Sequence, residues 1–168
     1  QPGNPFFVPD FAARFDYETE IVVKIAHVGK DISERFAHRY WNELTVGIDF
    51  TARELQKELR EKGMPWECWQ SFDGNAALGK FISKDELGCD VQDIHFHMDL
   101  NGERRQTGHT ADMIHTIDHI IAYASKFFTL KTGDLIFTGT PEGIGEVKEG
   151  DKIEAYIGDR KLLDLKIK

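Results

Sequence analysis

The segment DIHFHMDLNGERRQT, residues 93–107, contains the clearest structural signal in the sequence. Its first part, Asp93–Leu100, alternates in the way that a β-strand with one buried face requires. Asn101-Gly102 then supplies the dipeptide that two-residue hairpin turns prefer, because both positions tolerate a positive φ. Glu103–Thr107 returns as the second strand. The segment therefore predicts a β-hairpin in a β-rich fold.

Further strands and helices are expected on either side of this hairpin. β-Branched apolar runs predict strands, and apolar residues at helical spacing or charged runs that end at glycine predict helices. The strands are expected at Thr19–Ala26, Leu44–Ala52, Leu135–Gly139 and twice within Lys152–Lys168, joined through Gly158. The helices are expected at Ser33–Tyr40, Glu54–Lys62 and Ala111–Phe128, and Met64–Lys80 is expected to be long, irregular and functional. This order predicts an α+β, β-rich fold without a strict βαβ pattern.

The composition is that of one ordered globular domain comprising residues 1–168. Hydrophobic residues make up 40% and charged residues 30%, enough to bury a core without disulfides. The formal net charge of −8 disfavours a nucleic acid or an anionic membrane as a partner, because both bind basic surfaces. No apolar run approaches ~20 residues and no signal peptide is visible. Cys68 and Cys89 lack a CxxC spacing, so reduced thiols in a cytoplasmic protein are expected.

Three carboxylates, two where the chain enters the first expected strand and one within the second, indicate a cation site. Glu18 and Glu20 are two residues apart and therefore point to the same face of a strand. Asp49 lies within an apolar strand, where an unpaired charge is unfavourable. A hard divalent cation prefers such oxygen ligands and relieves their repulsion. The alternatives are two solvated acids at an exposed strand start, and a salt bridge between Asp49 and Arg53.

The glycine-rich loop GTPEGIG, residues 139–145, is the next candidate site. Its backbone amides and the Thr140 hydroxyl are suited to hold a carboxylate or phosphate oxygen, although a tight surface turn explains the same residues. The histidines give weaker signals. His95 and His97 share a strand face and are typical of the polar face of a hairpin. His115 and His119 are four residues apart but lack the glutamate of an HExxH site.

Longer motifs, in their order and approximate spacing, resemble the fumarylacetoacetate hydrolase family. These are YETEI (17–21), VGIDFTARELQ (46–56), KGMPWE (62–67), SFDG (71–74), NGERRQTGHTADMI (101–114) and GDLIFTGTPEGIG (133–145). The likeness runs from about Phe7 to the C-terminus and looks closest to the branch of small acylpyruvases and 2-hydroxyhepta-2,4-diene-1,7-dioate isomerases. It implies a mixed β-roll fold, usually a homodimer, with Mg²⁺, Mn²⁺ or Ca²⁺ bound by carboxylates.

The resemblance also implies roles for single residues. It places the metal on Glu18, Glu20 and Asp49, in agreement with the strand argument. Substrate contacts are implied at Arg53, Gln56 and Thr140, with Gly139 in the same loop. The family typically has a catalytic lysine just before the Ser-Phe pair, where this sequence has Gln70. An amide brings no charge, and losing one charge-assisted hydrogen bond costs about 1.5–3 kcal/mol, or roughly ten- to a hundredfold in rate.

The expected function is metal-dependent hydrolysis of a carbon–carbon bond in an acylpyruvate-like 2-oxo acid, with the metal acting as a Lewis acid. Isomerisation, tautomerisation or decarboxylation of a 2-oxo acid or diacid is the alternative, because it needs the same enolate without attack by water. Two further hypotheses remain. The protein could bind a metal ion but have weakened catalysis because of Gln70, or it could be a β-rich interaction domain without a metal. The family's water-activating His and Glu lie in a lid segment, and the sequence is expected to begin after it.

Overall fold

Two antiparallel β-sheets pack against each other in the computed structural model, which describes residues 4–168. Residues 1–3 of the expected domain lie outside the described residues. The six-stranded sheet has the order β3-β2-β1-β7, with β4 beside β2 and β8 beside β1, and the four-stranded sheet has the order β10-β9-β5-β6. The strands are β1 (Phe15–Ile25), β2 (Trp41–Ala52), β3 (Ala76–Leu78), β4 (Ile82–Ser83), β5 (His95–Leu100), β6 (Glu103–His109), β7 (Leu135–Phe137), β8 (Gly145–Val147), β9 (Lys152–Ile157) and β10 (Arg160–Lys166).

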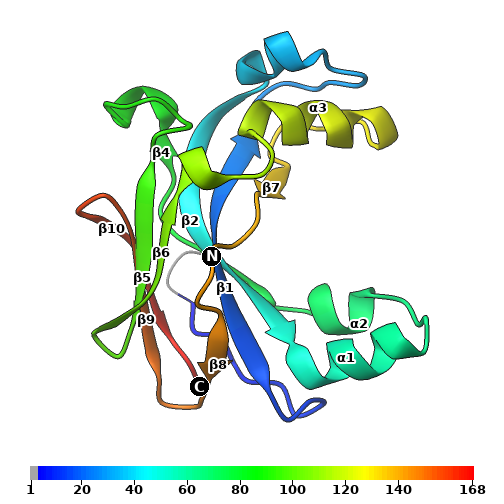
Figure 1. Cartoon of the computed structure of the whole chain (residues 1–168), viewed down its shortest axis with the longest axis vertical. Helices are drawn as coiled ribbons and strands as arrows, with labels where there is room; N and C mark the ends of the chain where they lie inside the picture. The colour runs from blue at the N-terminus through cyan, green and yellow to red at the C-terminus, as the bar shows by residue number, and fades with distance from the viewer. Residues whose placement is uncertain (1–3) are drawn as a thin grey trace.

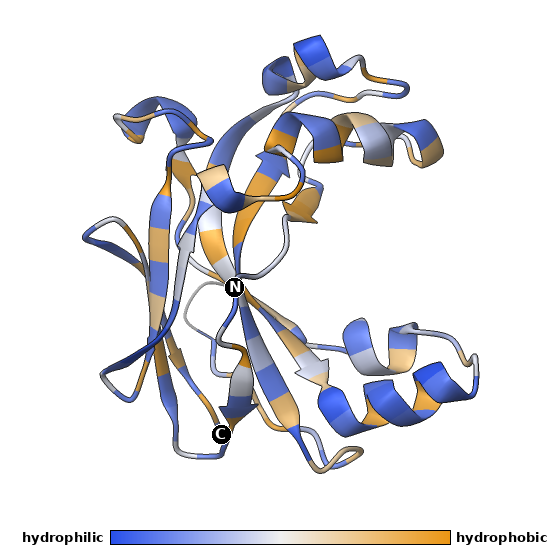
Figure 2. Ribbon diagram, in the orientation of Figure 1, coloured by the Kyte–Doolittle hydropathy of each residue, from blue (hydrophilic) through white to orange (hydrophobic). Residues whose placement is uncertain are grey.

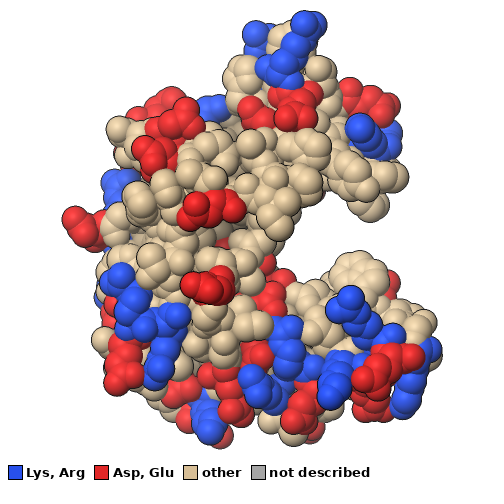
Figure 3. Space-filling model, viewed as in Figure 1, with Lys and Arg blue, Asp and Glu red and all other residues tan. Residues whose placement is uncertain are grey.

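The helices form two arms around an open hollow. They are α1 (Arg53–Glu61), α2 (Glu67–Gln70) and α3 (Ile117–Phe127), with short 3-10 helices η1 (Glu34–Arg39), η2 (Lys84–Glu86) and η3 (Thr110–Asp112). In Figure 1 the arm with α3 and the arm with α1 and α2 stand apart, which gives the molecule the outline of a C. The space-filling view shows the hollow between them (Figure 3). None of the described helices is long and apolar enough to cross a membrane.

The long β1–β2 pair separates the core from a polar face. Phe15, Tyr17, Ile21 and Val23 of β1 belong to the core, together with apolar residues of β9 and β10. The alternation along the strands is visible as changing colours in Figure 2. Because side chains alternate, the residues between these core positions point to the opposite face. That face carries the carboxylates of Glu18, Glu20 and Asp49.

The expected α+β, β-rich fold is confirmed, and so is the hairpin. β5 and β6 pair directly, and Asn101 and Gly102 adopt the positive φ values of 53° and 80° that the turn requires. The homodimer expectation stays a prediction, because the structure contains one chain.

Several expected boundaries were wrong. β1 begins at Phe15 instead of Thr19, which brings Glu18 inside the strand. α3 begins at Ile117 instead of Ala111, because the Thr116 hydroxyl accepts a hydrogen bond from the His119 amide and caps the helix there. Ile114, expected on the apolar stripe, is 94% exposed. The segment expected to be irregular contains α2 and β3.

Candidate metal centre

The register of β1 and β2 brings the three predicted metal ligands together. Glu18 lies directly opposite Asp49, and Glu20 lies opposite Gly47. Cross-strand partners share a face, so Asp49 points to the same side as both glutamates. One carboxylate oxygen from each of Glu18, Glu20 and Asp49 lies within 4.8 Å of the others. The carboxylates therefore converge as the strand argument requires.

Burial makes this cluster unfavourable in its charged form. Burial is the main cause that raises the pKa of Glu20 to about 7, although the Gly139 amide donates to it, and the charges of Asp49 and Glu18 raise it further. Burial likewise raises the pKa of Asp49 to about 6, against the hydrogen bond from Gln70. Acids that hold protons near neutral pH need a cation if they are to ionise together. The donor set of three carboxylates fits a hard divalent cation such as Mg²⁺ or Mn²⁺.

Arg53 organises one side of the cluster. Its Nε donates to Asp16 Oδ2 at 2.8 Å, Nη1 donates to Gln56 Oε1 at 2.6 Å, and Nη2 donates to Glu18 Oε1. Asp16 is 1% exposed and also accepts from Arg14 at 2.7 Å. Asp16 was not among the predicted site residues. The alternative pairing of Arg53 with Asp49 was wrong, because Arg53 forms its ion pairs with Asp16 and Glu18.

Asp49 is held by amides from the segment that follows α1. Gln70, the last residue of α2, donates through Nε2 to Asp49 Oδ2 at 2.5 Å. Asn75 donates through Nδ2 to Asp49 Oδ1 at 3.0 Å. Gln70 also accepts through Oε1 from the Thr51 hydroxyl at 3.2 Å, which fixes the orientation of its amide. Gln70 thus lies at the cluster, where its sequence position placed it, and Asn75 is an unpredicted neighbour.

The glycine-rich loop closes the other side. The Gly139 amide donates to Glu20 Oε2 at 2.6 Å, and Gly139 has a φ of +99°, a conformation that disfavours any side chain. Gln106, which is 1% exposed, links the loop to β1. Its Nε2 donates to Thr140 Oγ1 at 2.9 Å and to the Pro141 carbonyl at 3.0 Å, and its Oε1 accepts from the Thr19 amide at 3.0 Å. Gln106 was not among the predicted site residues, although it is a polar residue among those of β6 that point inward.

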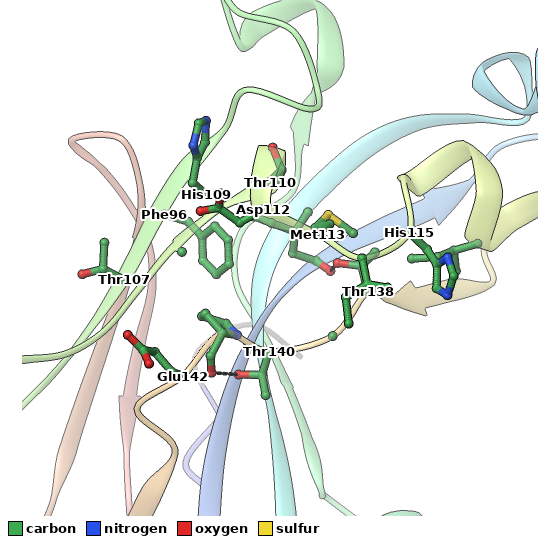
Figure 4. A pocket seen from close by; sticks show the side chains of 16 residues that line it. Phe96, Thr107, His109, Thr110, Asp112, Met113, His115, Thr138, Thr140 and Glu142 are labelled. Atoms are coloured by element: carbon green, nitrogen blue, oxygen red, sulfur yellow. Dashed lines mark hydrogen bonds between the residues drawn. The ribbon is translucent and has the colours of Figure 1, made fainter.

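A cavity of about 580 Å³ lies against this loop. Figure 4 shows Thr140 and Glu142 on the loop side of the cavity, and His109 and Phe96 on the strand side. Gly139 lines the cavity and also donates to Glu20, so the loop contacts both the carboxylate cluster and this space.

Replacing Gln106 with Ala should lower the free energy of unfolding by about 2–3 kcal/mol, because the Thr19 amide and the Pro141 carbonyl lose a buried partner. Urea unfolding monitored by circular dichroism measures this change. The exposed neighbour Arg105, which pairs with Glu103, provides the control, and Arg105→Ala should change stability by less than about 1 kcal/mol. Equal effects of the two substitutions would contradict the structural role of Gln106.

Comparison with known proteins places this geometry in a family. Residues 1–166 match the family described as fumarylacetoacetate (FAA) hydrolase C-terminal. The mitochondrial oxaloacetate tautomerase FAHD1 of Mus musculus is 37% identical over 166 residues, which are 99% of this chain and 75% of that protein. The oxaloacetate tautomerase YcgM of Escherichia coli is 38% identical over 150 residues, 89% of this chain and 68% of that protein.

A solved structure shares the fold over almost the whole chain. It is the fumarylpyruvate hydrolase from Pseudomonas aeruginosa in complex with Mn²⁺ and pyruvate, with a TM-score of 0.91 and 32% identity over 98% of this chain and 70% of that one. These relatives include tautomerases and a hydrolase, and they act on small molecules. The chain belongs to the fumarylacetoacetate hydrolase family of enzymes and has the fold of its C-terminal domain.

Proposed function

We propose that the chain catalyses keto–enol tautomerisation of a small 2-oxo diacid of the oxaloacetate type, with a divalent cation held by Glu18, Glu20 and Asp49. The observation that carries the proposal is the convergence of these three carboxylates within 4.8 Å on one sheet face. When bound, the cation supplies a Lewis acid that polarises the 2-oxo group. The names of the two tautomerases among the relatives support this choice of reaction.

Tautomerisation needs fewer groups than hydrolysis does. Tautomerisation moves one proton at the carbon beside the 2-oxo group and needs no activated water. Among the described residues, the side chains hydrogen-bonded to the three carboxylates are a guanidinium and two amides, from Arg53, Gln70 and Asn75. None of these accepts a proton from water at neutral pH.

Unused hydrogen-bonding capacity supports substrate contacts at three residues. Arg53 Nη1 and Nη2 each keep one N–H after their contacts with Gln56 and Glu18, and these can bind a substrate carboxylate. Gln56 uses its Oε1 for Arg53 and keeps its amide hydrogens for a substrate oxygen. Because Gln106 donates to Thr140 Oγ1, and the Thr140 contact with Pro141 is long at 3.5 Å, the hydroxyl hydrogen is available for a second substrate oxygen.

The assay follows the ultraviolet absorbance of enol-oxaloacetate as it converts to the keto form. Conversion above the uncatalysed rate is expected with Mg²⁺ or Mn²⁺, and it should disappear after chelation with EDTA. The Thr140→Val variant retains the shape of the side chain and removes the hydroxyl, so it should lower kcat/KM without changing metal affinity. Metal-saturated protein that leaves the rate unchanged would refute the proposal.

Hydrolysis of an acylpyruvate is the second candidate, and the likeness to the fumarylpyruvate hydrolase favours it. Release of pyruvate from acetylpyruvate under the same metal conditions tests this reaction. Turnover of acetylpyruvate without tautomerisation of oxaloacetate would assign the chain to the hydrolases.

Gln70→Lys should raise turnover about ten- to a hundredfold, because it places a cationic donor beside the cluster where the amide is an uncharged one. The measurement is kcat with Mg²⁺ saturating. Gln70→Met removes the donor without adding charge and should not increase the rate. An unchanged rate for Gln70→Lys would indicate that Gln70 is suited to this substrate and is not a weakened lysine.

A further inference from the structure

We infer that Asp93, His95 and His109 form a second metal site, one that takes a borderline transition-metal ion such as Zn²⁺. One ligand atom from each of these residues lies within 4.8 Å of the others. His95 and His109 are direct cross-strand partners of β5 and β6. Their imidazole centroids are 3.9 Å apart, and His109 Nε2 lies 2.8 Å from Asp93 Oδ1. The three side chains therefore already converge at one end of the hairpin.

The backbone fixes the positions from which these side chains extend. The Gly158 amide donates to the His95 carbonyl at 2.8 Å, which ties the start of β5 to the turn between β9 and β10. Thr110, just after β6, is bonded to Ile94, just before β5. Its amide donates to the Ile94 carbonyl, and its hydroxyl accepts from the Ile94 amide. These fixed backbone positions keep the three side chains within reach of one ion.

The side chains themselves remain free to adjust. The His109 and Asp93 side chains are 27% and 65% exposed, so an ion can enter and water can complete its coordination. An ion lies in the plane of each ring that binds it, so the stacked imidazoles must turn apart by rotation about their side-chain bonds. That rotation also replaces the His109–Asp93 hydrogen bond with two bonds to the ion.

The donor set separates this site from the carboxylate cluster. Two imidazoles and one carboxylate suit Zn²⁺, Ni²⁺ or Co²⁺, whereas Mg²⁺ prefers oxygen ligands alone. The two clusters share no residue. Of the three residues, His109 is the one that lines the cavity beside Gly139 and Thr140, and it lies at the edge of that cavity (Figure 4). The inference rests on this geometry and is independent of the proposed reaction.

Calorimetric titration with Zn²⁺ tests the site in protein already saturated with Mg²⁺. One equivalent of Zn²⁺ per chain is expected to bind. Binding of this Zn²⁺ equivalent should persist in the Glu20→Gln variant, because that substitution removes a ligand of the carboxylate cluster only. His95→Ala and His109→Ala should each weaken Zn²⁺ binding at least about tenfold, since each removes one of three ligands.

His97→Ala is the matched control, because His97 lies two residues along the same strand face and stacks on Tyr156 outside the cluster. It should leave the Zn²⁺ affinity unchanged. Unaltered Mg²⁺ binding by each histidine variant shows that the variant is folded. Co²⁺ provides a second readout, because its visible absorption spectrum should lose intensity in His109→Ala. Absence of a Zn²⁺ equivalent in the wild type, or its retention in the His95→Ala/His109→Ala double variant, would overturn the inference.

Discussion

Glu20→Gln is expected to weaken the binding of Mg²⁺ or Mn²⁺ by about a hundredfold or more and to abolish metal-dependent turnover. Removal of groups that only orient a ligand typically costs ten- to a hundredfold in metal affinity, and removal of a charged ligand should cost at least as much. Gln retains the size of the side chain and one oxygen, so the Gly139 amide keeps an acceptor. Isothermal titration with Mn²⁺ measures the affinity.

Glu43→Gln is the control for this experiment. Glu43 also lies on the β1–β2 pair, but it forms an ion pair with Lys24 at 2.7 Å, and both side chains are more than a third exposed. Surface pairs of this kind contribute at most about 1 kcal/mol, so the variant should bind Mn²⁺ as the wild type does. If Glu20→Gln also bound Mn²⁺ normally, the carboxylate cluster would not be the metal site.

Strand alternation predicted that Glu18 and Glu20 share a face, whereas the position of Asp49 beside them depends on how the two strands pair. The spacing of Glu18 and Glu20 was sufficient to place both on one face, because the side-chain period of a strand is fixed. The direct opposition of Glu18 and Asp49 depends on the register of two strands, which the alternation within either strand does not determine. Asp49 joined the prediction through its unusual place in an apolar strand and through family resemblance.

The supporting residues were harder to predict for a local reason. Asp16 lies three residues before the expected start of the first strand, and the alternation was extended back only as far as Glu18. Asp16 accepts hydrogen bonds from both Arg14 and Arg53. Gln106 lies 87 residues from its partner Thr19, and only the packing of the second sheet brings the two together. Short elements such as α2 form through tertiary contacts, and their sequences carry little helical signal.

The boundary error at α3 has a different origin. Ile114 fitted the apolar spacing of the helix, but spacing alone does not mark where a helix begins. The Thr116 side chain does so, through its hydrogen bond with the His119 amide. A capping threonine two residues after an apolar position was a signal available in the sequence, and it outweighed the periodicity.

The metal-free protein is expected to lose stability as pH rises from about 5 to about 8, while its affinity for Mg²⁺ rises. Burial raises the pKa of Glu20 from 4.5 to about 7. Between these two values the folded state holds a proton that the unfolded state has released, so stability falls with increasing pH. For Glu20 the loss is on the order of 3 kcal/mol. Asp49, whose pKa is raised to about 6, adds to the loss in the same direction.

Urea unfolding in the presence of EDTA at several pH values measures this loss. Glu20→Gln should make the profile shallower, because Gln has no proton to release and only the contribution of Asp49 remains. Glu43→Gln should leave the profile unchanged. Saturating Mg²⁺ should restore stability at the alkaline end, by about 2.7 kcal/mol when its concentration is a hundred times the Kd. Burial of the cluster thus has two opposite effects. Without a metal ion it destabilises the folded protein when the carboxylates are ionised, and for the same reason it favours binding of a cation. A metal-free protein that became more stable toward pH 8 would show that the three acids are not held in a shared, desolvated site.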